Sequence, residues 1–382
     1  MVYLDYNAST PVDPRILPGM IEAFDSFGNP SSLHHRAGQM AAELIEEARG
    51  RVAQLVGRPA QNVIFTSGAS EAAALALLGS MLGAQNRPNI VVSSTEHKAI
   101  LEAAELGARL SGGQVRYVRV DRNGVLDLNE FQRVADFSVS VVAVMAANNE
   151  TGVLGPLSEV ANIAKRQGAL VLVDATQLVG KGSLAEVSAV ADLFVISSHK
   201  IYGPKGAGAL VADRHTQKLL VPVASGGGQE RGLRGGTQNT PAIVGFGLAA
   251  ELALKEQTSD TARMNALVEK LLAKLRGGLD EFVVNGAGVP KLCNTLNVRF
   301  VGADAEAVMA SMSDVEVSAG SACQSAVSMP SHVLLAMGMT GHEASESLRI
   351  SLGRPTTEDD VIHASRSISA AVTRVREMAS DY

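Results

Sequence analysis

The sequence has only two cysteines, no excess of positive charge and no long apolar run. Two cysteines in 382 residues cannot build a disulfide framework, and without nearby histidine or cysteine partners they make a poor zinc site. A net charge of -6 provides no basic surface for a phosphate backbone, so we expect no direct nucleic-acid binding. The longest apolar run, residues 139–147, is too short to span lipid, and the first residues lack a basic segment followed by an apolar one. We therefore expect a cytoplasmic protein without a membrane contact.

Hydrophobic residues make up 46% of the chain, which is enough to fill two cores. Short β-branched runs alternate with helical patterns between about residues 60 and 215, which predicts an α/β fold with a mostly parallel sheet and helices on both faces. The predicted strands are 63–66, 90–93, 139–145, 170–173 and 193–196, and the predicted helices are 69–82, 99–110 and 157–167.

The C-terminal third follows a different pattern. The glycine-rich segment 226–237 predicts an exposed loop, residues 241–279 have helical patterns, and strands are expected near 295–300 and 347–352. We expect residues 12–255 to form a large domain, and residues 1–11 and 256–382 to form a smaller α+β domain.

A lysine and an acid follow two of the predicted strands. Lys200 lies in a turn rich in Ser, Gly and Pro after strand 193–196, and Asp174 comes directly after strand 170–173. Polar residues at this position lie at the carboxyl edge of the sheet, where open α/β sheets bind their ligands. Lys200 taken alone could be a solvated surface lysine, and Asp174 could be a helix N-cap. A lysine that makes a Schiff base and an acid that pairs with a pyridine nitrogen are, however, the two protein groups that pyridoxal 5'-phosphate requires, so the pairing favours a cofactor site.

Seven sequence blocks in order then resemble the cysteine desulfurase family, a class-V-aminotransferase-like group of fold-type-I pyridoxal-phosphate enzymes. They are residues 28–32, 66–71, 95–97, 148–152, 174–177, 198–200 and 234–237. The resemblance extends from residue 3 to residue 354 and implies a seven-stranded, mostly parallel sheet with a second, smaller α+β domain.

The resemblance implies roles around the cofactor ring. Lys200 would hold the cofactor, Asp174 would meet the pyridine nitrogen, and Gln177 would reach the ring hydroxyl. His97 would stack on the ring and move protons, a role that suits a side chain whose pKa lies near neutrality. Without the family, His97 would be read as a surface residue at a helix start.

The resemblance also implies a phosphate site. Ala69 and Ser70 open a helix whose free N–H groups point at an anion, although Ser70 by itself would pass as an N-terminal cap. Ser197 and His199 would complete the site from the same subunit, and Thr237 would arrive from the partner of a homodimer.

Two further residues are implied to bind the substrate, L-cysteine. Arg349 matches the family's carboxylate-binding arginine, and its guanidinium can form two parallel hydrogen bonds to a carboxylate. The alternative is a strand arginine that faces water. Asn148 would contact the ring and the substrate, and the alternative is a structural asparagine in a turn.

The two cysteines differ in their neighbours. Cys323 lies in a run of small residues, SAGSACQS, which lacks the bulky side chains that bury a structural thiol. Cys293 starts a strand-like run and is expected to pack in a core. We therefore expect a cysteine desulfurase that makes alanine and a persulfide on Cys323 for an acceptor protein. The rival is an aminotransferase or β-eliminating enzyme in which Cys323 is incidental. Iron-sulfur assembly, tRNA thiolation and DNA phosphorothioation all remain open as the destination of the sulfur.

Overall fold

The computed structural model describes residues 1–84, 86–319 and 329–380. The predicted sulfur acceptor, Cys323, therefore lies outside the described residues. Within these ranges, no helix combines the length and the apolar composition needed to cross a membrane.

A seven-stranded sheet forms the centre of the larger part of the molecule, in the order β2-β8-β7-β6-β5-β3-β4. Its strands are β2 (Val63–Thr66), β3 (Asn89–Ser93), β4 (Val115–Val118), β5 (Val139–Met145), β6 (Leu170–Asp174), β7 (Leu193–Ser197) and β8 (Gly208–Ala212). Neighbours from β7 to β4 are parallel, whereas β8 is antiparallel to both β7 and β2. The predicted mostly parallel sheet with flanking helices is confirmed.

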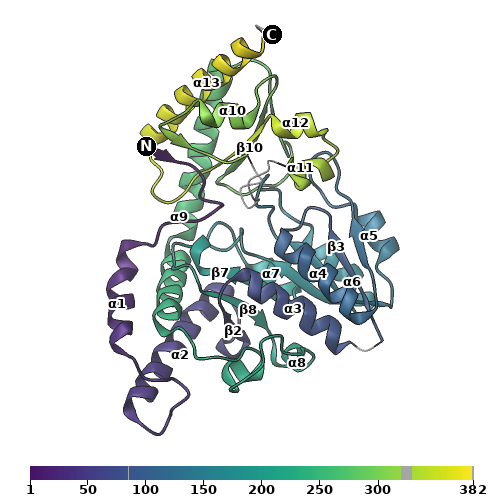
Figure 1. The fold of residues 1–382 in the computed structure, drawn as a ribbon, viewed down its shortest axis with the longest axis vertical. Coiled ribbons are helices and arrows are strands. Elements are labelled where there is room, and N and C mark those ends of the chain that lie inside the picture. The colour runs from purple at the N-terminus through teal and green to yellow at the C-terminus, as the bar shows by residue number, and fades with distance from the viewer. Residues whose placement is uncertain (85, 320–328, 381–382) are drawn as a thin grey trace.

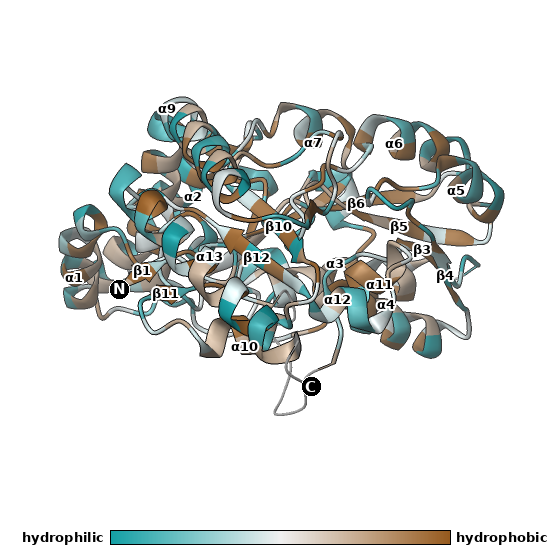
Figure 2. Ribbon diagram, turned by 90° about the horizontal axis from the view of Figure 1, so that it is seen from above, coloured by the Kyte–Doolittle hydropathy of each residue, from teal (hydrophilic) through white to brown (hydrophobic). Residues whose placement is uncertain are grey.

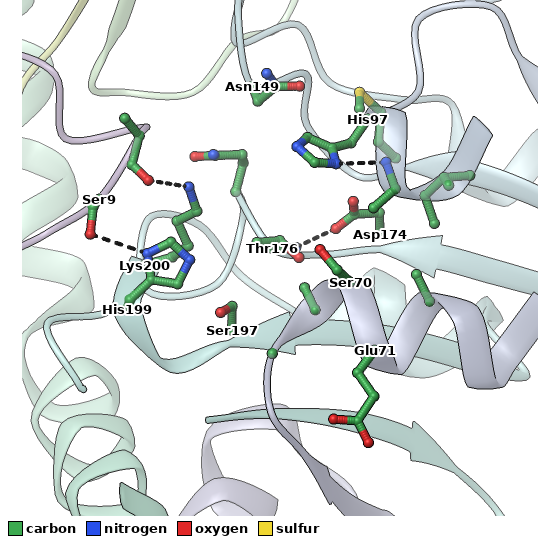
Figure 3. Close-up of a pocket in the computed structure, with 18 of the residues that line it drawn as sticks. Ser9, Ser70, Glu71, His97, Asn149, Asp174, Thr176, Ser197, His199 and Lys200 are labelled. Atoms are coloured by element: carbon green, nitrogen blue, oxygen red, sulfur yellow. Dashed lines mark hydrogen bonds between the residues drawn. The ribbon is translucent and has the colours of Figure 1, made fainter. Parts of the chain in front are cut away.

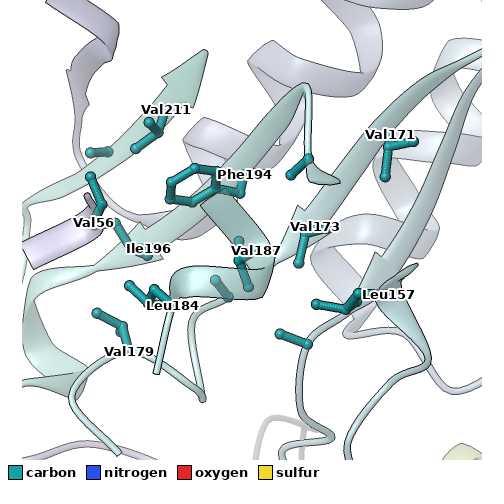
Figure 4. Packing of buried hydrophobic residues seen from close by; sticks show 14 of the residues in the cluster. Val56, Leu157, Val171, Val173, Val179, Leu184, Val187, Phe194, Ile196 and Val211 are labelled. Carbon is teal, nitrogen blue, oxygen red and sulfur yellow. The ribbon is translucent and has the colours of Figure 1, made fainter. Parts of the chain in front are cut away.

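Successive residues of these strands enter two different cores, because side chains alternate between the faces of a sheet. In β6, Val171 and Val173 join the cluster that Figure 4 shows around Phe194, whereas Leu172 belongs to a second cluster on the opposite face. The first cluster is completed by helices α2 (Arg36–Val56), α6 (Leu157–Arg166), α7 (Ala185–Val190) and the start of α9, and the second by α3 (Ala69–Gly83) and α4 (Lys98–Ser111). The remaining helices of this part are α1 (Leu17–Asp25), α5 (Leu128–Val134) and α8 (Arg214–Gln217).

A smaller part is built on a three-stranded antiparallel sheet, in which β10 (Thr295–Phe300) lies between β12 (Ser347–Ser351) and β9 (Phe282–Val284). The chain's first strand, β1 (Val2–Tyr3), pairs with β11 (Val315–Glu316), so the N-terminus packs here too. The helices of this part are α10 (Ala305–Ala310), α11 (His332–Ala336), α12 (Gly341–Ser345) and α13 (Glu358–Ser380). Figure 2 shows hydrophobic residues along β10 and β12 beneath the mixed surface of α13.

A single helix of 39 residues, α9 (Thr240–Gly278), connects the two parts (Figure 1). Its beginning packs through Phe246 in the core of the large sheet, and its end packs through Leu271 in the core of the smaller part. The division predicted near residue 255 thus falls inside a continuous helix. The domain boundaries stay a prediction.

Candidate active site

The carboxyl ends of β6 and β7 lie beside a cavity of about 550 Å³. Asp174 is the last residue of β6, and Lys200 ends the short helical turn that follows β7. Figure 3 shows Lys200 and His199 on one side of this cavity, with Asp174, His97 and Ser70 on the other. The predicted residues that line it are Ala69, Ser70, His97, Asp174, Gln177, Ser197, His199 and Lys200.

The amine of Lys200 is held by the N-terminal segment. Its Nζ donates to the carbonyl oxygens of Asn7, at 2.5 Å, and Ala8, at 2.8 Å. The segment is itself tied to the lysine turn, because both the N–H and the hydroxyl of Thr10 donate to the carbonyl of His199. A segment nearly two hundred residues away in sequence therefore positions the predicted cofactor amine.

Asp174 faces the cavity with one carboxylate oxygen accepting the N–H of Thr176 at 2.9 Å. A second acid, Glu96, lies nearby and is completely buried. Burial raises the pKa of Glu96 well above its usual range, and the charge of Asp174 raises it further. The neutral form of Glu96 is therefore favoured, and of these two acids it is Asp174 that lines the cavity.

His97 is the N-cap of α4, with its Nδ1 accepting the N–H of Ala99 at 3.1 Å. A ring nitrogen that accepts a hydrogen bond carries no proton, so the neutral ring holds its proton on Nε2. Burial lowers the pKa of His97, against the opposing charge of Asp174. Burial thus favours a neutral imidazole, the form that can accept a proton.

One end of the cavity is suited to an anion. Residues 67–70 lead into α3, whose first-turn N–H groups have no partner within the helix. A side chain on Gly208 of β8 would come within 2.6 Å of the Gly68 backbone, so glycine there lets the start of α3 lie against the strand. Lys205 lines the same cavity. Burial and the neighbouring lysines, Lys200 first, lower the pKa of His199 to about 4, and its Nδ1 lies 3.2 Å from the hydroxyl of Ser9.

The structure differs from the sequence prediction at Asn148. Its Nδ2 donates to the carbonyl of Thr95 and to the sulfur of Met145, while its Oδ1 accepts the N–H groups of Glu150 and Thr151. These bonds hold the Asn148 side chain within the turn after β5, which it stabilises. Its neighbour Asn149 lines the cavity instead. Neighbouring residues point in different directions in such a turn, and the motif alone did not distinguish the two.

Arg349 lies in the middle of β12 and is buried next to the cavity wall. Its Nη1 donates to the carbonyl of Asn149 at 3.1 Å, and its Nη2 pairs with Asp5 at 2.6 Å. Its Nε is buried with no hydrogen-bond partner among the described residues. The alternative of a water-facing arginine therefore does not hold, and the guanidinium keeps a donor for a ligand.

Thr237 is exposed and is not among the residues that line this subunit's cavity. Its predicted role, in the phosphate site of a partner subunit, stays a prediction. Cys293, by contrast, is buried, with its sulfur 3.5 Å from the carbonyl of Lys181. Burial raises the pKa of the Cys293 thiol, which makes it a poor nucleophile.

The residues around the cavity fit pyridoxal phosphate. The cavity offers an amine, an acid on a neighbouring strand and a helix start for a phosphate. In addition, the buried hydroxyl of Thr176 has no hydrogen-bond partner in the described part of the chain, as expected of a cavity group that bonds a ligand. Ser9, Asn149, Thr176 and Lys205 were not singled out from the sequence. Thr176 lies in a block that did signal the site, whereas Ser9 carried no signal of its own.

Comparisons with known proteins identify the family of the chain. The family model described as Aminotransferase class-V matches residues 2–363. A cysteine desulfurase of Frankia sp. (strain EuIK1) is 43% identical over 99% of this chain and 93% of its own length. The structure of a NifS-like protein has a TM-score of 0.87 at 34% identity, covering 98% of this chain and 99% of the other. A structure described as SspA in complex with cysteine has a TM-score of 0.79 at 32% identity, covering 92% and 99%. Because these matches extend over nearly the whole chain and agree with the cavity chemistry, the chain belongs to the cysteine desulfurases, pyridoxal-phosphate-dependent enzymes of the class-V aminotransferase family.

Proposed function

We propose that this protein transfers the sulfur atom of L-cysteine to its own Cys323 and releases alanine. The observation that carries the proposal is the cavity shared by Lys200, Asp174 and His97, with Arg349 directly behind its wall. A relative of similar fold has been solved in complex with cysteine, which supports the same substrate here.

The cofactor site is formed by residues from several elements. Lys200 would bind the cofactor covalently, Asp174 would pair with its ring nitrogen, and Gln177 would donate to its ring oxygen. Ala69, Ser70, Ser197 and His199 would surround its phosphate. Bound pyridoxal phosphate supplies an electron sink that weakens bonds at the carbon next to the substrate amine.

The chain's own side chains then divide the remaining work. Arg349 would bind the substrate carboxylate through the donors that Asp5 and Asn149 leave available, and neutral His97 would accept and return protons. The thiolate of Cys323 would attack the substrate sulfur. A sulfur–sulfur bond forms as the carbon–sulfur bond breaks, the electron pair of the broken bond stays on carbon, and that carbon takes up a proton to give alanine.

The two cysteines provide the experiment that tests this function against a rival elimination reaction. Cys323→Ser should bind cofactor and cysteine yet lose nearly all alanine formation, because an alcohol is a far weaker nucleophile than a thiolate. Cys293→Ser, the matched control in the core, should retain turnover per folded enzyme. Sulfide release by Cys323→Ser at the wild-type rate would favour direct elimination on the same cofactor.

A homodimer is part of the proposal. Large apolar side chains are exposed on α1 and in the following connection, with Ile21 at 67%, Phe24 at 68% and Phe27 at 89% exposure. Such a patch is typical of a protein interface. In a two-fold dimer, exposed Thr237 could reach the phosphate site of the other subunit. Sedimentation should give a dimer at micromolar concentration, and a fully active monomer would contradict the shared site.

We place the enzyme in the cytoplasm, where an acceptor protein would take the sulfur from Cys323. The acceptor's own thiolate would attack the outer sulfur of the persulfide and regenerate the Cys323 thiolate. Incubation with cysteine labelled at its sulfur atom should leave the label on Cys323, and a reduced acceptor protein should remove that label. The genes that neighbour this one would indicate which acceptor to try first.

A further inference from the structure

A second lysine, Lys181, is buried behind the cavity, and none of the proposed steps uses it. Its Nζ donates to Oε1 of Gln177 at 2.8 Å and to Oδ1 of Asn7 at 3.1 Å. Its side chain is only 7% exposed, and among the described residues no carboxylate pairs with it. A buried amine paired only with amide oxygens is costly, and such a residue is expected to do more than fill space.

The amine determines which way the Gln177 amide points. Both ends of a glutamine amide have nearly the same shape, so its orientation follows from its partners. A lysine ammonium can only donate, so the oxygen of Gln177 must face Lys181 and the NH2 group must face away from it. Burial is the main cause that lowers the pKa of Lys181, to about 7, followed by the charge of Lys200. A neutral amine would still have two N–H donors, one for each oxygen.

The NH2 group of Gln177 is thereby directed at the carbonyl of Asn7, which also holds the amine of Lys200. Its Nε2 donates to the carbonyl of Asn7 at 2.9 Å, and the same oxygen accepts from Nζ of Lys200 at 2.5 Å. The two donors therefore converge on one atom at the cavity wall. Because Gln177 lines the cavity, the second N–H of the amide would be available to a ring oxygen of the cofactor. Reversing the amide would present an acceptor to that oxygen and place two donors against each other at Lys181.

Asn7 does not need Lys181 in the same way. Its Nδ2 donates to the carbonyl of Asn149 and to the hydroxyl of Thr295, and its Oδ1 also accepts from Asn294. These bonds determine the orientation of the Asn7 amide without the lysine. Within the described part of the chain, the Gln177 amide bonds Lys181 and the carbonyl of Asn7 alone, and that carbonyl by itself would hold the amide less firmly.

We infer that Lys181 is a positioning residue that orients the Gln177 amide for cofactor binding. The inference rests on the proposed function, in which Gln177 meets the ring oxygen. Lys181 acts through Gln177 alone, so its removal matters only while Gln177 is present.

A double-mutant cycle between Lys181→Met and Gln177→Leu tests this dependence. The readouts are the dissociation constant for pyridoxal phosphate and the absorption maximum of the bound cofactor, measured on the full-length protein. Lys181→Met should weaken cofactor binding by about tenfold, as for the loss of one well-placed hydrogen bond. Its absorption maximum should shift in the same direction as that of Gln177→Leu. In the Gln177→Leu background, the Lys181 substitution should change binding by less than about twofold.

The control is Lys291→Met, which alters a partly buried lysine that bonds the carbonyl of Asn285 and has no bond to Gln177 among the described residues. It should leave both readouts unchanged. If Lys181→Met does not fold, Lys181→Gln replaces it in the double-mutant cycle. Lys181→Gln keeps a hydrogen-bond donor without the charge, so it should bind the cofactor more tightly than Lys181→Ala does.

Equal effects of Lys181→Met in both backgrounds would overturn the inference, as would an unchanged absorption maximum. If the wild-type protein binds cofactor and makes alanine but the two substitutions have additive effects, the inference about Lys181 is wrong and the proposed function stands. A wild-type protein that binds no pyridoxal phosphate at all would overturn the proposed function itself.

Discussion

The edge of the seven-stranded sheet and the strand β12 supply two halves of the active site in different ways. Asp174 and Lys200 come from the ends of neighbouring strands, so the topology of the sheet brings them together. Arg349 comes from the middle of a strand in the smaller part, and it is directed by Asp5 of the N-terminal segment and by the carbonyl of Asn149. The cofactor half depends on strand order, whereas the substrate half depends on the contact between the two parts.

Substitutions in the cofactor half and in the substrate half should therefore have different effects on activity. Changes in the cofactor half should remove the chemistry itself, since its groups would contact the reacting centre. Changes in the substrate half should act more gradually, because Arg349 shares its donors among several partners. Four substitutions, given in order of decreasing expected effect, test this distinction.

The largest effect is expected for Lys200→Ala in the cofactor half. Without the amine no covalent link to the cofactor can form, and alanine production should fall by at least about 10³-fold. Borohydride should attach the cofactor to the wild-type protein and not to the variant. Lys205→Ala removes another lysine of the same cavity and should be far milder. Comparable losses in both variants would show that Lys200 has no special position.

The next effect concerns Glu150, which follows β5 and connects the two parts of the molecule by accepting the hydroxyl of Ser331, the N-cap of α11. Burial raises the pKa of Glu150 from its usual 4.5 to about 7. The folded protein therefore binds more protons than the unfolded chain between these pH values, so stability is lost as pH rises from about 4.5 to 7. Between pH 4.5 and 7.5, the free energy of unfolding should therefore fall by about 3 kcal/mol more in the wild-type protein than in Glu150→Gln. Urea unfolding at the two pH values measures this difference. Equal slopes with pH in both proteins would contradict the assignment.

In the substrate half, Arg349→Lys should raise KM for cysteine by roughly tenfold to a hundredfold, because an ammonium cannot form the two parallel hydrogen bonds of a guanidinium. Cofactor absorption should be unchanged. Arg299→Lys on β10, whose guanidinium pairs with Glu343 and Glu346, is the matched control and should leave KM as it is. Loss of cofactor from Arg349→Lys would mean that the two halves are not separate.

The smallest effect is expected for Asp5→Asn. The asparagine oxygen can still accept from Arg349, while the negative charge that competes with the substrate carboxylate is gone. KM for cysteine should fall by about twofold to fivefold, because a neutral oxygen holds the guanidinium by roughly 1 kcal/mol less than a charged one does. A rise in KM in steady-state assays would indicate that the charge of Asp5 is needed to hold Arg349 in place.

Local pattern was enough to predict most of the cofactor half. Alternation of β-branched runs with helical patterns predicted the strands around the site, and the polar residues after them placed Asp174 and Lys200 at one edge. Strand ends are local features, and the parallel sheet then brings them together. The resemblance added His97, Gln177 and four phosphate-site residues, Ala69, Ser70, Ser197 and His199, which all line the cavity, whereas Thr237 does not. Their roles stay predictions until tested.

The sequence was enough to predict which residue types the site would contain and near which strand ends they would lie, because hydrophobic periodicity and turn residues act over a few positions. It did not determine that Asn149, rather than Asn148, lines the cavity, that Asp5 would pair with Arg349, or that Lys181 would lie behind Gln177. Each of these depends on contacts between segments far apart in sequence, or on the direction of one side chain in a turn. Only tertiary packing decides such contacts, because burial and hydrogen-bond geometry are properties of the whole fold.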